Sequence, residues 1–64
     1  MWKSLNDAQP AWGDECWITD GEAVVNAEYY LGASGYMWIG DDFYSLNKFD
    51  TWMYIFESKP DIPK

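Results

Sequence analysis

The sequence predicts a small, mainly β domain. We expect an antiparallel sheet of about four strands, a meander strongly twisted or closed toward a small barrel, with an irregular or short helical segment at its N-terminus. Short runs rich in aromatic and β-branched residues recur along the chain, and Gly, Asn, Asp and Pro punctuate them. A chain of 64 residues has room for one core, so we expect a single domain over residues 1–64.

The first elements are a lead-in and a hairpin. Residues 1–13 show no clean periodicity and are rich in turn formers, which predicts an irregular or briefly helical segment. The run ECWIT at 15–19 is a short strand candidate, Asp20-Gly21 is a strong hairpin turn, and EAVVNAEYYL at 22–31 is a longer strand. Alternation predicts that one face of this longer strand packs in the core: Ala23, Val25, Ala27, Tyr29 and Leu31.

The second half repeats the pattern. Residues 32–35 are expected to form a loop, YMWIG at 36–40 a third strand, and TWMYIF at 51–56 a last strand before a Pro-containing tail. The run at 43–50, FYSLNKFD, fits either a helical turn or a short strand. Both faces of the last strand are apolar, and Trp52, Tyr54 and Phe56 share one of them. We therefore expect this strand to be central in the sheet or to display its rings to a partner.

Charge and ring content point to a binding role. Eleven acidic residues oppose four lysines, for a net charge of −7, which disfavours direct binding to nucleic acid or to an anionic membrane and favours a partner protein with a basic surface. Five Trp, five Tyr and three Phe are more rings than so small a core can hide, so several are expected at the surface. The alternatives are a solvated acidic surface and a core built from large side chains.

The residue inventory argues against catalysis. Histidine is absent and Cys16 is the one cysteine, so a Cys/His zinc site and a disulfide framework are not expected, and a Ser or Cys nucleophile would lack its usual base. We therefore predict no catalytic residue, no metal site and no cofactor. No run of apolar residues fits a secretory leader or a membrane span, which favours a cytoplasmic protein.

A set of landmarks carries a family resemblance. The chain opens with Trp2, Ser4 and Leu5 and a Pro at position 10, continues with Asp20-Gly21 and with Ala27-x-Tyr29, and ends with Thr51-Trp52-Met53 and a Pro-rich tail. In this order it resembles the small phage and prophage proteins of the domain-of-unknown-function family DUF551. The resemblance implies a phage or mobile-element origin, and the family carries no catalytic residues to transfer.

Together these observations predict a phage-encoded, non-enzymatic protein that inhibits or modulates a host nucleic-acid-handling or defence enzyme through an acidic, aromatic surface that imitates nucleic acid. A small-molecule or glycan-binding module that uses exposed rings (Tyr36, Trp38, Trp52, Tyr54) is the alternative, and a homodimer through the aromatic strand is a further one. The predicted partner-binding residues are Glu22, Glu28, Tyr30, Trp38, Asp41, Asp42, Tyr44 and Trp52.

Overall fold

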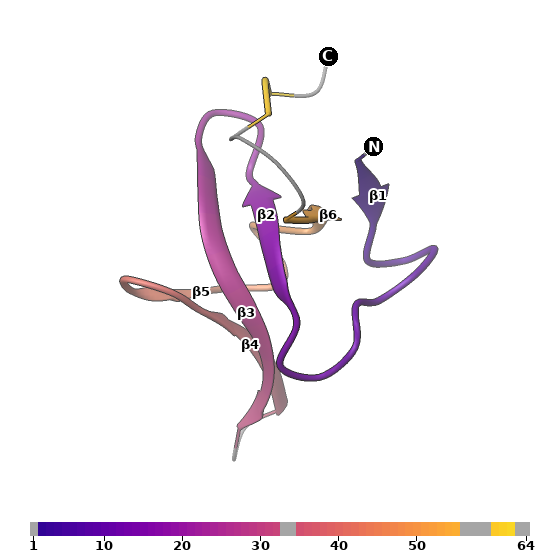
Figure 1. Ribbon diagram of the computed structural model, residues 1–64, viewed down its shortest axis with the longest axis vertical. Coiled ribbons are helices and arrows are strands. Elements are labelled where there is room, and N and C mark those ends of the chain that lie inside the picture. Colours follow the sequence, from indigo (N-terminus) through magenta and orange to yellow (C-terminus); the bar gives the residue numbers. More distant parts are fainter. Residues whose placement is uncertain (1, 33–34, 56–59, 63–64) are drawn as a thin grey trace.

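The structure is a computed structural model that describes residues 2–32, 35–55 and 60–62. These residues form six strands and no helix: β1 (Lys3–Ser4), β2 (Glu15–Thr19), β3 (Val24–Gly32), β4 (Gly35–Ile39), β5 (Phe43–Tyr44) and β6 (Thr51–Tyr54). The strands lie in one open sheet of order β1-β6-β2-β3-β4-β5 (Figure 1). Every neighbouring pair is antiparallel. Among the described residues there is accordingly no helix that could cross a membrane.

The mainly β class is confirmed, but the barrel and the helical lead-in are wrong. The sheet stays open because the outer strands, β1 and β5, do not pair with each other. At the N-terminus, β1 pairs with β6 instead of starting a helix. One turn follows, in which Ser4 C=O accepts hydrogen bonds from the N–H groups of Asp7 and Ala8. Pro10 has no N–H to extend that turn, so the chain continues as an irregular loop.

The order of the strands explains how the core is assembled. Strands β2 to β5 form a meander, and β6 returns to lie between β1 and β2, so of the two placements predicted for this strand the central one is observed. Phe56, predicted to continue the aromatic row of β6, lies outside the described residues. The ambiguous run at 43–50 contains the two-residue strand β5 followed by a single turn, in which Phe49 N–H donates to Ser45 C=O at 2.9 Å.

Of the predicted core face of β3, Val25, Ala27 and Tyr29 are confirmed, whereas the prediction is wrong for Ala23 and Leu31. Ala27 lies opposite Cys16, and Val25 lies opposite Ile18. The face loses its cover at the ends of the strand, where Ala23 and Leu31 are exposed. The buried apolar residues of the described chain are Cys16, Ile18, Val24, Ala27, Tyr29, Trp38, Phe49 and Trp52. Val24 belongs to the opposite, outer face of the sheet and is buried there against expectation.

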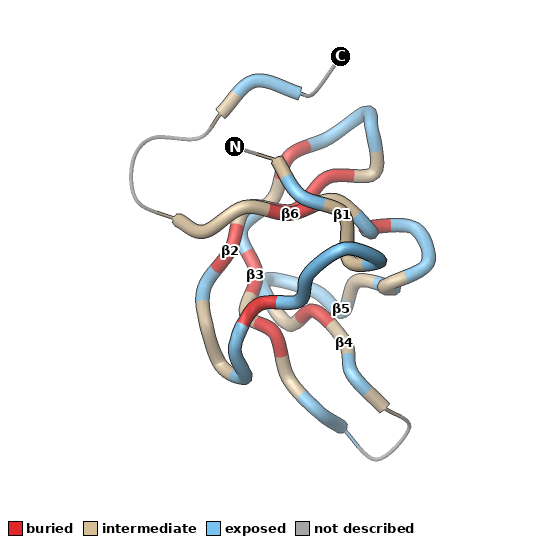
Figure 2. Tube along the Cα trace, turned by 90° about the vertical axis from the view of Figure 1, so that its right-hand side faces the viewer, coloured by how far each residue is buried: buried red, intermediate tan, exposed pale blue. Residues whose placement is uncertain are grey.

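Two buried indoles fasten the covering loops to the core face. The indole N–H of Trp52 donates to Ala8 C=O at 2.9 Å, and that of Trp38 donates to Phe49 C=O at 2.8 Å. Figure 2 shows buried positions along the strands and the largely exposed loop between β1 and β2 passing in front of them. The loop over residues 5–12 and the turn over 45–50 thus form the second layer of the domain.

Glycines close two of the turns. In the β2–β3 turn, Gly21 has a φ of 95°, a conformation that side-chain-bearing residues avoid, and Asp20 Oδ1 accepts hydrogen bonds from the N–H groups of Glu22 and Ala23. After β4, a Cβ at Gly40 would collide with the carbonyl oxygen of Asn26. Gly40 therefore lets the β4–β5 turn pass close to β3.

The indole bond of Trp38 is open to a direct test. Trp38→Phe should lower the free energy of unfolding by about 2–4 kcal/mol, because it leaves the Phe49 carbonyl without a partner and opens a cavity in the core. Urea unfolding followed by circular dichroism measures the change. Trp12→Phe, at a ring 65% exposed, is the matched control and should shift stability by less than about 0.5 kcal/mol. Equal stability of the two variants would refute the fastening role.

Asp20 predicts a pH dependence. Hydrogen bonds from the N–H groups of Ala23 and Glu22, with a smaller contribution from nearby Lys48, lower the pKa of Asp20 below its ordinary value of 3.8. The charged form is therefore favoured by folding, and its contribution to stability is present above about pH 4 and lost as the pH falls through the lowered pKa. Asp20→Asn should be less stable than the parent at pH 7, and the difference should shrink at pH 3. A difference that stays constant between these pH values in urea unfolding would contradict this role.

Candidate functional site

A large hollow lies between the covering layer and the end of the β3–β4 hairpin. Its volume is about 720 Å³, within the range usual for ligand sites. We call it the aromatic cleft, and it is lined by Leu5, Asn6, Gln9, Pro10, Trp12, Tyr29, Tyr36, Leu46, Asn47 and Asp50. Its walls come from the β1–β2 loop, from β3 and β4, and from the turn before β6. The cleft therefore depends on the same loops that the two indoles fasten.

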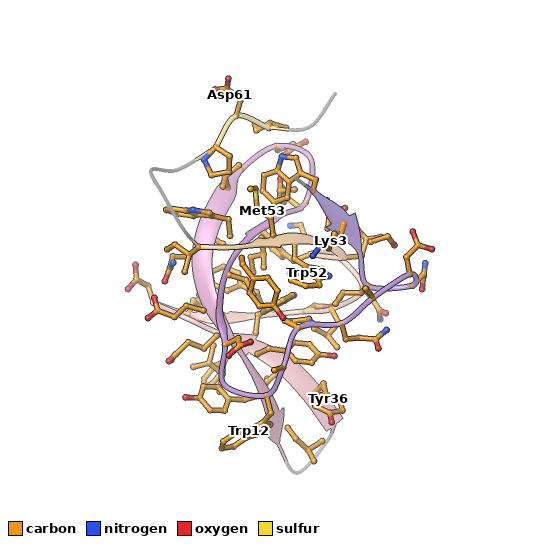
Figure 3. The ribbon with its side chains drawn as sticks, turned by 45° about the vertical axis from the view of Figure 1, so that its right-hand side comes forward. Lys3, Trp12, Tyr36, Trp52, Met53 and Asp61 are labelled. Carbon is orange, nitrogen blue, oxygen red and sulfur yellow. The ribbon has the colours of Figure 1, made fainter. Side chains whose placement is uncertain are left out.

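Aromatic rings form one end of the aromatic cleft. The ring of Tyr36 stacks on that of Tyr29, with centroids 4.9 Å apart and planes 7° from parallel. The rings of Trp12 and Tyr30 are nearly perpendicular, with their centroids 5.3 Å apart. Trp12 is 65% exposed and Tyr36 49% exposed, and Figure 3 shows them at the same end of the molecule. Each ring is thus positioned by a second ring while a large part of its surface stays open to solvent.

The electrostatics of the aromatic cleft are one-sided. Asp50 is the one charged residue among the described residues that line it. Both lysines within the described ranges are engaged elsewhere: Lys3 Nζ lies 5.0 Å from the ring centroid of Trp52 and 5.3 Å from that of Tyr54, and Lys48 Nζ lies 3.8 Å from Asp20 Oδ2. The aromatic cleft is therefore lined by one acidic residue and by exposed rings, with no cation of its own within the described chain.

Two predicted partner-binding residues lie in the core. Trp38 is 0% exposed and Trp52 is 1% exposed, so the prediction that they lie at a binding surface is wrong. Their rings are the largest fully buried side chains of the described protein, and each indole N–H is used inside it. The four-ring platform of the ligand-binding alternative loses the same two members.

The other predicted residues fall into separate groups. Glu28 and Tyr30 are neighbours on the outer face of β3, with the Tyr30 hydroxyl 3.4 Å from the Glu28 carboxylate oxygens. Glu28, Asp41 and half-buried Tyr44 line a second hollow of about 570 Å³. Asp42 is exposed beside Asp41 in the β4–β5 turn, and Glu22 is exposed in the β2–β3 turn. The structure thus brings Glu28, Tyr30, Asp41 and Tyr44 into one region, whereas Glu22 lies in a different turn.

The acids do not form a row on one strand face. Among the described acids only Glu15 and Glu28 are strand residues, and they lie opposite each other across β2 and β3. The remaining described acids occupy turns and loops: Asp7, Asp14, Asp20, Glu22, Asp41, Asp42, Asp50 and Asp61. Three of the ten, Asp14, Glu15 and Glu28, line one hollow, and the others belong to several different turns and loops.

Sequence reasoning missed most of the aromatic cleft. Trp12 is one of thirteen rings that the sequence does not distinguish, and Asn6, Gln9, Asn47 and Asp50 carry no signal beyond turn chemistry. Tyr36 was included only in the alternative platform. The available signal was the position of Trp12 and Tyr36 next to two glycines, Gly13 and Gly35, which are residues typical of turns.

Cys16 is buried next to acids. Burial, together with the charges of Asp14 and Glu15, raises the pKa of its thiol from 9.0 to about 12. The thiol is therefore protonated at neutral pH, and a protonated thiol is a poor nucleophile and metal ligand. Within the described ranges no group of three or more His, Cys, Asp or Glu side chains is arranged to hold a metal ion.

Comparison of the chain with protein-family models, with curated proteins and with solved structures finds no match. The function is therefore inferred from the geometry of the surfaces described above.

Alkylation tests the state of Cys16. Native protein at pH 8 should react with iodoacetamide at least about a hundredfold more slowly than protein unfolded in urea, because burial removes access and the raised pKa removes the thiolate. Mass spectrometry of timed samples measures both rates. Similar rates in the native and unfolded protein would show that the thiol is accessible and reactive in the fold.

Proposed function

We propose that the protein is a non-enzymatic binding module that takes a basic segment of a partner protein into the aromatic cleft. One observation carries the proposal: Trp12 and Tyr36, whose rings are exposed, line the same hollow as the acidic residue Asp50. Rings and a carboxylate are the groups that a lysine or arginine side chain contacts through its apolar stem and its charged end.

The molecule binds one of its own lysines in a comparable way. Lys3 Nζ lies over the rings of Trp52 and Tyr54. Such a contact contributes about 0.5–2 kcal/mol, the larger values applying where water is excluded. In the aromatic cleft the partner's cation would gain the same ring contact at Trp12 or Tyr36 and the added attraction of Asp50.

Long-range charge supports a basic partner. With a net charge of −7, the domain attracts basic surfaces during encounter and repels nucleic acid. The resemblance to the phage family DUF551 supports a host protein as the source of the segment, and basic segments are typical of nucleic-acid-handling enzymes. Occupation of such a segment would inhibit or retune the host protein. The spread of acids over several turns favours this local contact over imitation of a phosphate row.

The amides favour a second candidate, a glycan. Asn6, Gln9 and Asn47 line the same hollow as the rings of Trp12 and Tyr36. Rings that stack on a sugar face and amides that bond its hydroxyls are a common combination in ligand sites. This candidate needs no basic group in the ligand, so ligand charge distinguishes the two.

Selection from a random peptide library should reveal the preferred chemistry. We expect the immobilised domain to enrich peptides with lysine or arginine flanked by apolar residues, and to lose them on Trp12→Ala or Asp50→Asn. The bound fraction should fall as salt is raised from 50 to about 500 mM, because the attraction is screened.

The matched control is Asp61→Asn, which removes the same unit charge. Asp61 lies at the opposite end of the molecule from Trp12 and Tyr36 (Figure 3), so this variant should retain the selected peptides. Equal losses with Asp61→Asn and Asp50→Asn would show that net charge alone acts. Enrichment of uncharged peptides, or their displacement by neutral oligosaccharides, would contradict the basic partner and favour the glycan.

A further inference from the structure

The outer edge of β4 is paired along only part of its length. Neighbouring β5 covers Trp38 and Ile39, whereas β4 itself begins at Gly35. Beyond Tyr44 the chain leaves the sheet and enters the turn at 46–48. Among the described residues, therefore, no strand lies beside Gly35–Met37 on this side.

The backbone of Tyr36 points toward this open edge. Tyr29 directs both its backbone groups toward the start of β2: its N–H donates to Asp14 C=O at 3.2 Å, and its C=O accepts from Gly13 N–H at 2.6 Å. Tyr29 lies opposite Trp38, so Trp38 directs its own backbone groups away from β3.

Alternation along an antiparallel strand gives Tyr36 the same direction as Trp38. Gly40, two residues beyond Trp38, agrees with this assignment, since its N–H donates across the β4–β5 turn to Asp42 C=O at 3.0 Å. The N–H and C=O of Tyr36 are thus aimed past the end of β5, at the open edge.

A hollow adjoins the open edge. Its volume is about 490 Å³, and its lining includes Met37, Phe43 and Leu46. Phe43 is 68% exposed, the highest value among the exposed large hydrophobic residues of the described chain. Tyr36, Leu46 and Asn47 line both this hollow and the aromatic cleft, so the two hollows are neighbours.

We infer that the partner's basic segment binds as an added β-strand along Gly35–Met37, the part of β4 that β5 does not cover. This inference rests on the proposed function and specifies its binding mode. The segment pairs with the N–H and C=O of Tyr36, and because side chains alternate along a strand, one reaches the aromatic cleft while its neighbour lies toward Phe43.

Charge selects a basic partner over a second copy of the chain. Two copies of the chain, each with a net charge of −7, repel each other. A lysine-containing strand has the opposite charge and is attracted to the domain and to the cleft that Asp50 lines. The open length, Gly35–Met37, offers few backbone bonds, so side-chain contacts in the two hollows supply the rest of the affinity.

Amide hydrogen exchange of the 15N-labelled protein tests the added strand. The probe is a ten-residue peptide of alternating lysine and valine, with both ends blocked, and its control alternates glutamate and valine. In the free protein the Tyr36 amide should exchange rapidly and the Met37 amide slowly, because the backbone N–H of Met37 points toward β3. The lysine peptide should slow exchange at Tyr36, and the glutamate peptide should not.

Chemical synthesis of the chain with N-methyl-tyrosine at position 36 removes the donor and keeps the ring. Affinity for the lysine peptide should fall about fivefold or more, the effect of losing one hydrogen bond. The near-ultraviolet circular dichroism of the core rings should stay unchanged, as a control for folding.

The outcomes separate the binding mode from the function. Loss of peptide binding on Trp12→Ala and Asp50→Asn, with no change at the Tyr36 amide, would overturn the added strand and leave the proposed function standing. Binding that is absent or insensitive to Trp12 and Asp50 would overturn both. Protection of Tyr36 that rises with protein concentration in the absence of peptide would show that a second copy occupies the edge, and would overturn the basic partner.

Discussion

Two indole hydrogen bonds hold the working surface of this domain in place. Trp38 and Trp52 are buried in the sheet, and their N–H groups reach the carbonyl oxygens of Phe49 and Ala8 in the two covering loops. Cys16, the one cysteine, is a free thiol, so no disulfide shares this task. Each bond is buried or partly buried, and a buried donor or acceptor without a hydrogen-bond partner lowers the stability of the fold by about 1–3 kcal/mol. The loops that carry the walls of the aromatic cleft are therefore positioned by the core itself.

The strand order makes the position of the N-terminal loop depend on β6. Because β6 lies between β1 and β2, the first strand joins the sheet only through the last one within the described chain. Trp2 adds a bond from its indole N–H to Asp61 C=O at 3.1 Å, which links the two ends of the described chain. Contacts this distant in sequence cost more loop-closure entropy than local ones. The N-terminal loop, and with it one wall of the aromatic cleft, is thus coupled to the placement of β6.

The sequence was sufficient for the four longer strands and for the middle of β3, because alternation and turn residues are local. Val25, Ala27 and Tyr29 were assigned correctly to the core, and the central place of β6 was one of the two placements predicted. The site was harder to predict because Trp38, Trp52 and Trp12 are the same residue type, and only tertiary packing decides which is buried. The pairing of β1 with β6 spans most of the chain, and two-residue strands such as β1 and β5 have too few residues for a period to show.

The acidic charge and the open edge of β4 have a common explanation in this view. An unpaired strand edge beside exposed rings invites association between copies, and proteins limit this hazard with short edges and with charge. Here β1 and β5 are two residues long, and the open part of β4 is confined to Gly35–Met37. A net charge of −7 adds repulsion between copies. The same repulsion becomes attraction for a basic strand, so the feature that keeps the edge free of the protein's own copies is also the one that selects its partner.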